Sequence, residues 1–122
     1  MNWYFGWGMI LTAFVTGAVL GLFFYRADFL GGYASFRRRI LRLGHIALAA
    51  LGMVNILYSL SPMASERSLQ TGVASLGFII GGITMPSVCF LSSWRAGFRG
   101  LFFIPVICLV VAAVLTLWYG PS

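Results

Sequence analysis

Four long stretches of this chain carry no Asp, Glu, Lys or Arg. They cover residues 3–24, 43–65, 68–94 and 100–122. An α-helix needs about 20 apolar residues to cross the hydrocarbon core of a bilayer. Backbone groups in lipid must be bonded within the protein, and these stretches lack the polar–apolar alternation of barrel strands. The sequence therefore predicts an all-α membrane protein with four transmembrane helices, near residues 3–25, 41–61, 69–92 and 99–119.

Composition supports this class. Only 8% of the residues are charged and 61% are hydrophobic, whereas about 25% are charged in an average soluble domain. We expect a single domain over residues 1–122, an up-down bundle with short loops. The first apolar stretch has no basic region before it and is long for a signal peptide, so we expect it to be retained.

The arginines predict the orientation in the membrane. All eight basic residues are arginine, and only Arg67 lies between the second and third predicted helices. Under the positive-inside rule, both termini are then non-cytoplasmic, and a bacterial plasma membrane is the natural location. We expect phospholipid headgroups, rather than nucleic acid, to be the anionic partners of these arginines. The residues concerned are Arg37, Arg38, Arg39, Arg42, Arg95 and Arg99.

Aromatic residues predict belts at the two membrane interfaces. The outer belt would consist of Trp3, Tyr4, Trp7, Tyr58, Trp118 and Tyr119, and the inner belt of Tyr25, Tyr33 and Trp94. Two prolines, Pro86 and Pro105, are expected to kink the third and fourth helices, because each lacks a backbone N–H.

Small residues recur at helical spacing and predict where helices approach one another. In lipid, close backbone approach through small side chains drives helix association. The candidates are Ala13, Gly17 and Gly21 in the first helix, Gly52 and Asn55 in the second, and Gly77 and Gly81 in the third. We expect these residues to serve contacts within the chain more than self-association.

His45 is the only histidine, and it lies inside an apolar stretch. We expect it to hydrogen-bond a neighbouring helix, a loop or a headgroup. The alternative is a cofactor site, because His45 is predicted at nearly the same membrane depth as Met85 and Cys89. Those two residues are one helical turn apart, and imidazole, thioether and thiol together suit Cu(I), while a His and Met pair can ligate haem.

Candidate catalytic groups are lacking. No predicted span contains Asp or Glu, which counts against proton-coupled transport and against hydrolysis by paired carboxylates. We therefore expect no enzyme, but a non-catalytic subunit or accessory factor packed against a larger complex of integral membrane subunits. One alternative is a copper- or haem-handling protein that uses His45 with Met85 and Cys89. The other is a small channel or carrier that uses the kinked helices and Asn55.

Overall fold

The structure is a computed structural model that describes residues 1–32 and 34–120, and every regular element in this part of the chain is helical. The four long helices are α1 (Asn2–Phe24), α2 (Phe36–Leu60), α3 (Leu69–Trp94) and α4 (Phe103–Tyr119). The 3-10 helices η1 (Phe29–Gly31), η2 (Pro62–Ser65) and η3 (Ala96–Phe102) lie in the connections. The all-helical class predicted from the sequence is confirmed.

All four helices are long and apolar enough to cross a membrane, when η3 is counted together with α4. The four spans have 23 to 26 residues and a mean hydropathy between 1.8 and 2.8. Large apolar side chains remain on the outside, such as Phe14 at 72% exposure and Leu117 at 85%. Such a surface suits lipid and not water, so the helices indicate a multi-pass membrane protein.

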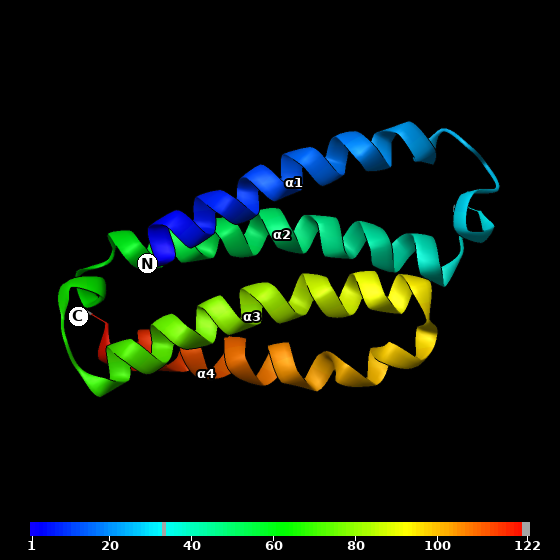
Figure 1. Ribbon diagram of the computed structural model, residues 1–122. Coiled ribbons are helices and arrows are strands. Elements are labelled where there is room, and N and C mark those ends of the chain that lie inside the picture. The colour runs from blue at the N-terminus through cyan, green and yellow to red at the C-terminus, as the bar shows by residue number, and fades with distance from the viewer. Residues whose placement is uncertain (33, 121–122) are drawn as a thin grey trace.

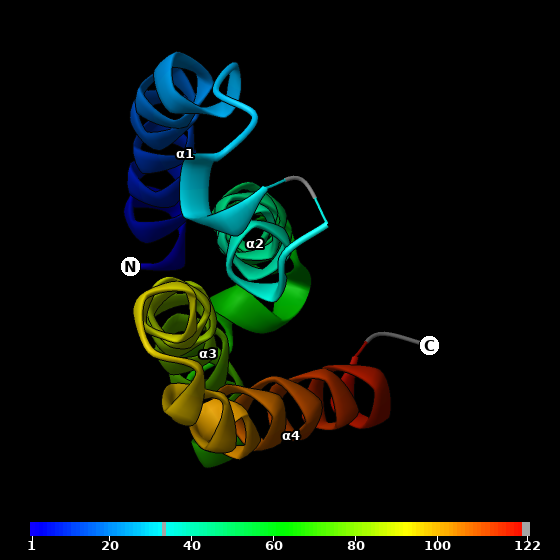
Figure 2. The ribbon, with the colours of Figure 1, turned by 90° about the vertical axis from the view of Figure 1, so that its right-hand side faces the viewer.

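Successive helices run in opposite directions (Figure 1). The N-terminus, η2 and the end of α4 lie at one end of the molecule, which we call the terminal end. The other end, formed by η1, η3 and the start of α2, is the arginine-rich end. Figure 2 shows α2 and α3 in the middle, with α1 and α4 at the two sides. Each helix packs against the next one in the chain, and α1 makes only a small contact with α3. The helices therefore form an open row.

Two apolar clusters hold this row together. One lies between α2, α3 and α4 and consists of Tyr58, Met63, Ala74, Phe78 and Ala112. The other lies where α1 meets α2 and consists of Met9, Ala13 and Leu48. In α1, the buried residues all come from its first half, Asn2 to Ala13, so the second half of this helix has a largely open surface.

The second helix begins at Phe36 and not near residue 41. Ser35 acts as its N-cap, because the Ser35 side chain accepts a hydrogen bond from the backbone N–H of Arg38. Arginine is a good helix former, so the basic run can continue the helix. Arg37, Arg38 and Arg39 therefore stand on the first turn of α2 rather than in a loop.

The two prolines have different positions. Pro86 lies inside α3, which continues to Trp94. Pro105 lies in the first turn of α4, where a missing N–H costs no intrahelical hydrogen bond. The fourth span is thus a 3-10 segment followed by an α-helix, and the α-helix begins at Phe103 and not near residue 99.

Most of the aromatic residues expected at the interfaces are exposed near the helix ends. This holds for Trp3, Tyr4, Trp7, Trp118 and Tyr119 at the terminal end, and for Tyr25 and Trp94 at the arginine-rich end. Tyr58 differs, because its side chain is buried. Tyr33 lies outside the described residues.

Candidate functional site

A buried polar cluster joins α1, α2 and α3 near the terminal end. The Asn2 amide donates to the side-chain oxygen of Asn55 at 2.9 Å and to the backbone oxygen of Ser75 at 3.3 Å. The Ser75 hydroxyl in turn donates to the Asn2 side-chain oxygen. The Asn55 amide donates to the carbonyls of Leu51 and Phe78. Every polar atom of both asparagine side chains is therefore bonded, as burial in a membrane protein requires.

Asn55 was predicted as a contact residue, and it is fully buried at the centre of this cluster. Asn2 was not among the residues predicted from the sequence. The only feature in the sequence that could have indicated a role for Asn2 is its polar amide directly before an apolar span, and side chains at such a position are usually solvated. Only the arrangement of α1 across α2 and α3 brings Asn2 to Asn55.

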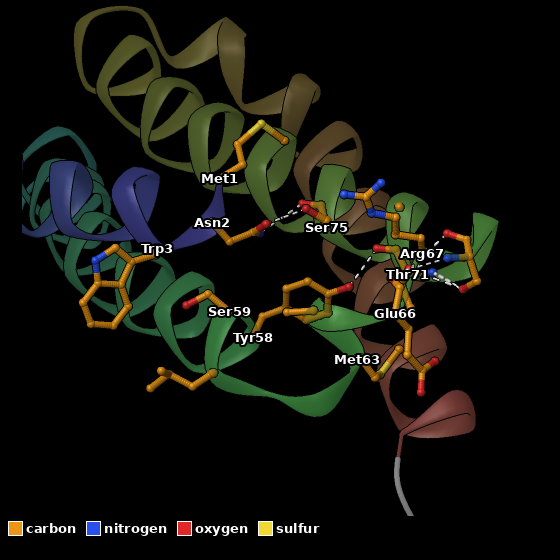
Figure 3. A pocket seen from close by; sticks show the side chains of 14 residues that line it. Met1, Asn2, Trp3, Tyr58, Ser59, Met63, Glu66, Arg67, Thr71 and Ser75 are labelled. Atoms are coloured by element: carbon orange, nitrogen blue, oxygen red, sulfur yellow. Dashed lines mark hydrogen bonds between the residues drawn. The ribbon is translucent and has the colours of Figure 1, made fainter.

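An open cleft of about 580 Å³ borders this cluster at the terminal end. Tyr58 lies on its wall and donates its hydroxyl to the Thr71 carbonyl at 2.7 Å (Figure 3). Tyr58 is therefore a contact between α2 and α3, and not the belt residue that the sequence predicted. Glu66 and Arg67, the two charged side chains of the second loop, are exposed at the rim. The polar side chains beneath the cleft, Asn2, Asn55 and Tyr58, hydrogen-bond to groups of neighbouring helices. These hydrogen bonds therefore join α1, α2 and α3.

His45 faces α1. Its Nδ1 lies 3.2 Å from the Thr16 hydroxyl, and a Cβ on Gly17 would lie 2.9 Å from the His45 ring. The Thr16 hydroxyl is also within hydrogen-bond distance of the Thr12 and Ala13 carbonyls of its own helix. Which group donates between Thr16 and Nδ1 depends on the tautomer of the His45 ring. The structure thus gives His45 a neighbouring-helix partner.

The other proposed cofactor ligands lie on α3. Cys89 is fully buried, and its Cβ lies 2.8 Å from where a Cβ on Gly44 would stand. Met85 is half-buried. In the described part of the chain no hydrogen bond joins His45, Met85 and Cys89, and no group of three His, Cys, Asp or Glu side chains could hold a metal ion. The copper or haem site stays a prediction.

Two arginines at the arginine-rich end bind backbone carbonyls. Arg38 is fully buried and donates to the carbonyls of Phe24 and Arg26, where α1 ends, and its guanidinium lies 4.4 Å from the centre of the Phe24 ring. Arg37 donates to the Ser93 carbonyl, in the last turn of α3, at 2.6 Å. Carbonyls at a helix end lack intrahelical donors and carry partial negative charge. Both arginines therefore tie helix ends together, besides any contact with lipid.

The remaining arginines that were predicted to meet headgroups are exposed. They are Arg39 and Arg42 on α2, Arg95 after α3 and Arg99 on η3. Their guanidinium groups are accessible to the headgroup region of a membrane.

The small residues divide between two helix contacts. A Cβ on Gly6 would lie 2.6 Å from the Gly52 carbonyl oxygen, so the backbones of α1 and α2 nearly touch there. A Cβ on Gly77 would meet Ala112 of α4 at 2.9 Å.

The other predicted small residues also lie at these two helix contacts, except Gly21. Ala13 is buried against α2, and Gly81 faces Leu109 of α4. Gly21, in contrast, would have no atom within 4 Å of a Cβ. Other glycines, Gly6 and Gly44 among them, make equally close contacts and were not predicted from the sequence.

Comparison of the chain with protein-family models, with curated proteins and with solved structures finds no match.

Proposed function

We propose that this chain is a non-catalytic subunit or accessory factor that packs against a larger complex of integral membrane proteins. In this proposal the chain is an up-down bundle in a bacterial plasma membrane, with both termini on the non-cytoplasmic side. The observation that carries the proposal is a groove of about 430 Å³ between α1 and α3, with Leu48 of α2 on its wall, which we call the α1–α3 groove.

Small residues line much of the α1–α3 groove. Gly8 and Thr12 come from α1, and Gly82 and Ser87 come from α3. A Cβ on Gly8 would meet no atom within 4 Å. Thr12 and Ser87 are exposed, and their hydroxyls donate to carbonyls of their own helices, those of Gly8 and Ile83. Each hydroxyl oxygen keeps the capacity to accept a hydrogen bond from outside.

This lining suits a transmembrane helix of another protein. Interfaces between membrane helices are enriched in Gly, Ser and Thr, because these residues allow backbones to approach and supply hydrogen bonds. Elsewhere the exposed surface of α1 and α4 consists mainly of large apolar side chains, such as Phe14, Val110 and Leu117, which suit lipid chains. A partner helix in the α1–α3 groove would add contacts to α1, whose own contacts come mainly from α2.

Site-specific photo-crosslinking in native membranes tests this proposal. A photoreactive amino acid at Thr12 or Ser87 is expected to crosslink one integral membrane protein of defined mass. The same amino acid at Phe14 or Val110, which are exposed outside the groove, is the matched control and is expected not to crosslink that protein.

Co-purification in mild detergent is the second measurement. The partner is expected to be recovered at a fixed ratio to this chain. Gly8→Leu, which fills the groove, should abolish both its recovery and its crosslinks. Equal crosslinking from all four positions, or crosslinks to lipid alone, would contradict the proposal.

A further inference from the structure

At the arginine-rich end, α1 and α2 diverge. The two helices touch through Gly6 and Gly52 near the terminal end, and α1 then leans away from α2 (Figure 1). Between them lies a hollow of about 290 Å³, lined by Gly17, Leu20, Gly21 and Phe24 of α1 and by Arg42, His45 and Ile46 of α2. Since a Cβ on Gly21 would meet no atom within 4 Å, the hollow is open there.

A second hollow, of about 310 Å³, adjoins the first. It is lined by Arg39, Arg42, Leu43 and Ile46, so the two hollows share Arg42 and Ile46. Together they form a groove, which we call the α1–α2 groove. It follows α2 from Arg39 to Ile46, a rise of about 10 Å at 1.5 Å per residue.

The groove is charged at one end and apolar along the rest. Arg39 and Arg42 are exposed, and the guanidinium group of neither has a hydrogen bond or an ion pair with residues 1–32 or 34–120. The one acidic residue in the first loop, Asp28, does not line the groove. Two guanidinium groups without an internal anion thus stand above a channel of Gly, Leu, Phe and Ile.

His45 marks the inner end of this channel. Its Nδ1 is hydrogen-bonded with the Thr16 hydroxyl, and its ring lies against Gly17, so the imidazole joins α1 and α2 where the two helices begin to separate. The groove is therefore narrow at His45 and widens toward Gly21 and the arginines.

We propose that the α1–α2 groove binds one anionic phospholipid. The phosphate lies between Arg39 and Arg42, and one acyl chain runs over Gly21 and Gly17 between Phe24, Leu20 and Ile46. Guanidinium groups form strong, charge-assisted hydrogen bonds with phosphate oxygens. Basic pockets between transmembrane helices on the cytoplasmic side are suited to anionic headgroups. An anionic phospholipid has a charged headgroup followed by a hydrocarbon tail. The groove has guanidinium groups followed by apolar side chains, in the same order.

Native mass spectrometry of the purified chain in mild detergent tests this inference. Titration with phosphatidylglycerol is expected to give one tightly bound lipid per chain, and phosphatidylcholine should bind more weakly. Arg42→Gln and Arg39→Gln should each weaken phosphatidylglycerol binding about fivefold, the factor that corresponds to about 1 kcal/mol per arginine near an anionic surface. Gly21→Leu should also weaken binding, although it changes no charge.

Arg99→Gln is the matched control, because it removes the same charge from η3, outside the groove. It should leave the affinity unchanged. Equal losses of phosphatidylglycerol affinity in Arg42→Gln and Arg99→Gln would overturn the proposal in favour of a diffuse charge effect. An unchanged affinity in Gly21→Leu would show that the lipid does not lie in the groove. Soluble glycerol phosphate should not displace the lipid, and displacement at equal concentration would show that the acyl chain contributes nothing. Thermal unfolding of each variant verifies that it is folded.

Discussion

At the scale of single residues, two glycines determine how closely α1 and α2 approach. A Cβ on Gly6 would lie 2.6 Å from the Gly52 carbonyl oxygen and 2.7 Å from Ile56. A backbone atom cannot move aside as a side chain can, so Gly6→Ala should force the two helices apart. We expect it to lower the free energy of unfolding by about 1–3 kcal/mol, the usual cost of overpacking. Thermal unfolding in detergent measures the effect.

Gly8→Ala is the control for this prediction. A Cβ on Gly8 would meet no atom within 4 Å. Both variants gain the same helix propensity, about 1 kcal/mol. Gly8→Ala should therefore be as stable as the wild type or more stable, and the difference between the two variants reports the clash. Equal unfolding temperatures would show that the contact between Gly6 and Gly52 does not constrain the fold.

The bond between Asn2 and Asn55 predicts energetic coupling between α1 and α2. The two amides are buried and joined at 2.9 Å. Hydrogen bonds between membrane helices contribute about 0.6 kcal/mol on average, and up to about 1.7. In a double-mutant cycle with Asn2→Ala and Asn55→Ala, we expect a coupling of about 1 kcal/mol in the free energy of unfolding. Additive effects of the two substitutions would contradict the shared network.

The sequence predicted the kind of contact that a residue makes better than it predicted the partner of that contact. Asn55, a polar residue inside a span, indicated a helix contact, whereas its partner Asn2 could not be found, because nothing local to residue 2 reveals which helix it crosses. The prediction that Tyr58 belongs to an interface belt was wrong for a related reason. An aromatic residue near a helix end suits an interface belt and a helix contact equally well, and only the position of the Thr71 carbonyl distinguishes them.

At the scale of elements, the number of helices followed from length and hydropathy, but their starts depended on local bonds. Charge predicted a loop at Arg37–Arg39, yet the Ser35 cap begins α2 at Phe36. Small-residue spacing indicated faces that can approach another helix. It could not say which neighbour each face meets, because that depends on crossing angles. This is why Gly77 and Gly81 contact α4 while Gly21 is left open.

The contact between α3 and α4 depends on one face of α4, and two adjacent alanines test it. Ala112 is fully buried against Gly77, whereas Ala113 is exposed. Ala112→Leu adds a bulky side chain between the helices, and we expect a loss of about 1–3 kcal/mol in the free energy of unfolding. Ala113→Leu adds the same atoms toward lipid and should change stability little. Equal effects on thermal unfolding would mean that α4 does not pack through this face.

At the scale of the whole molecule, the open row leaves two grooves of different character. The α1–α3 groove is lined by small residues and hydroxyls, and the α1–α2 groove has two free guanidinium groups at one end. The α1–α2 groove lies along the second half of α1, which has no buried residues, and the α1–α3 groove lies along its first half, where α1 makes only a small contact with α3. A partner helix and a lipid would therefore bind different segments of α1, and either would limit the movement of this helix.

The orientation of the molecule in the membrane decides which leaflet supplies that lipid. All arginines except Arg67 lie at the arginine-rich end, so the positive-inside rule predicts that this end is cytoplasmic. In a bacterial host, a cysteine at Gly97 on η3 should be protected from a membrane-impermeant maleimide in intact cells and labelled after lysis. A cysteine at Ser65 on η2 should be labelled in intact cells, because Ser65 is exposed at the opposite end. The wild-type chain, whose Cys89 and Cys108 lie within the helices, gives the background. The reverse labelling pattern would place the arginines outside, and a lipid in the α1–α2 groove would then come from the outer leaflet.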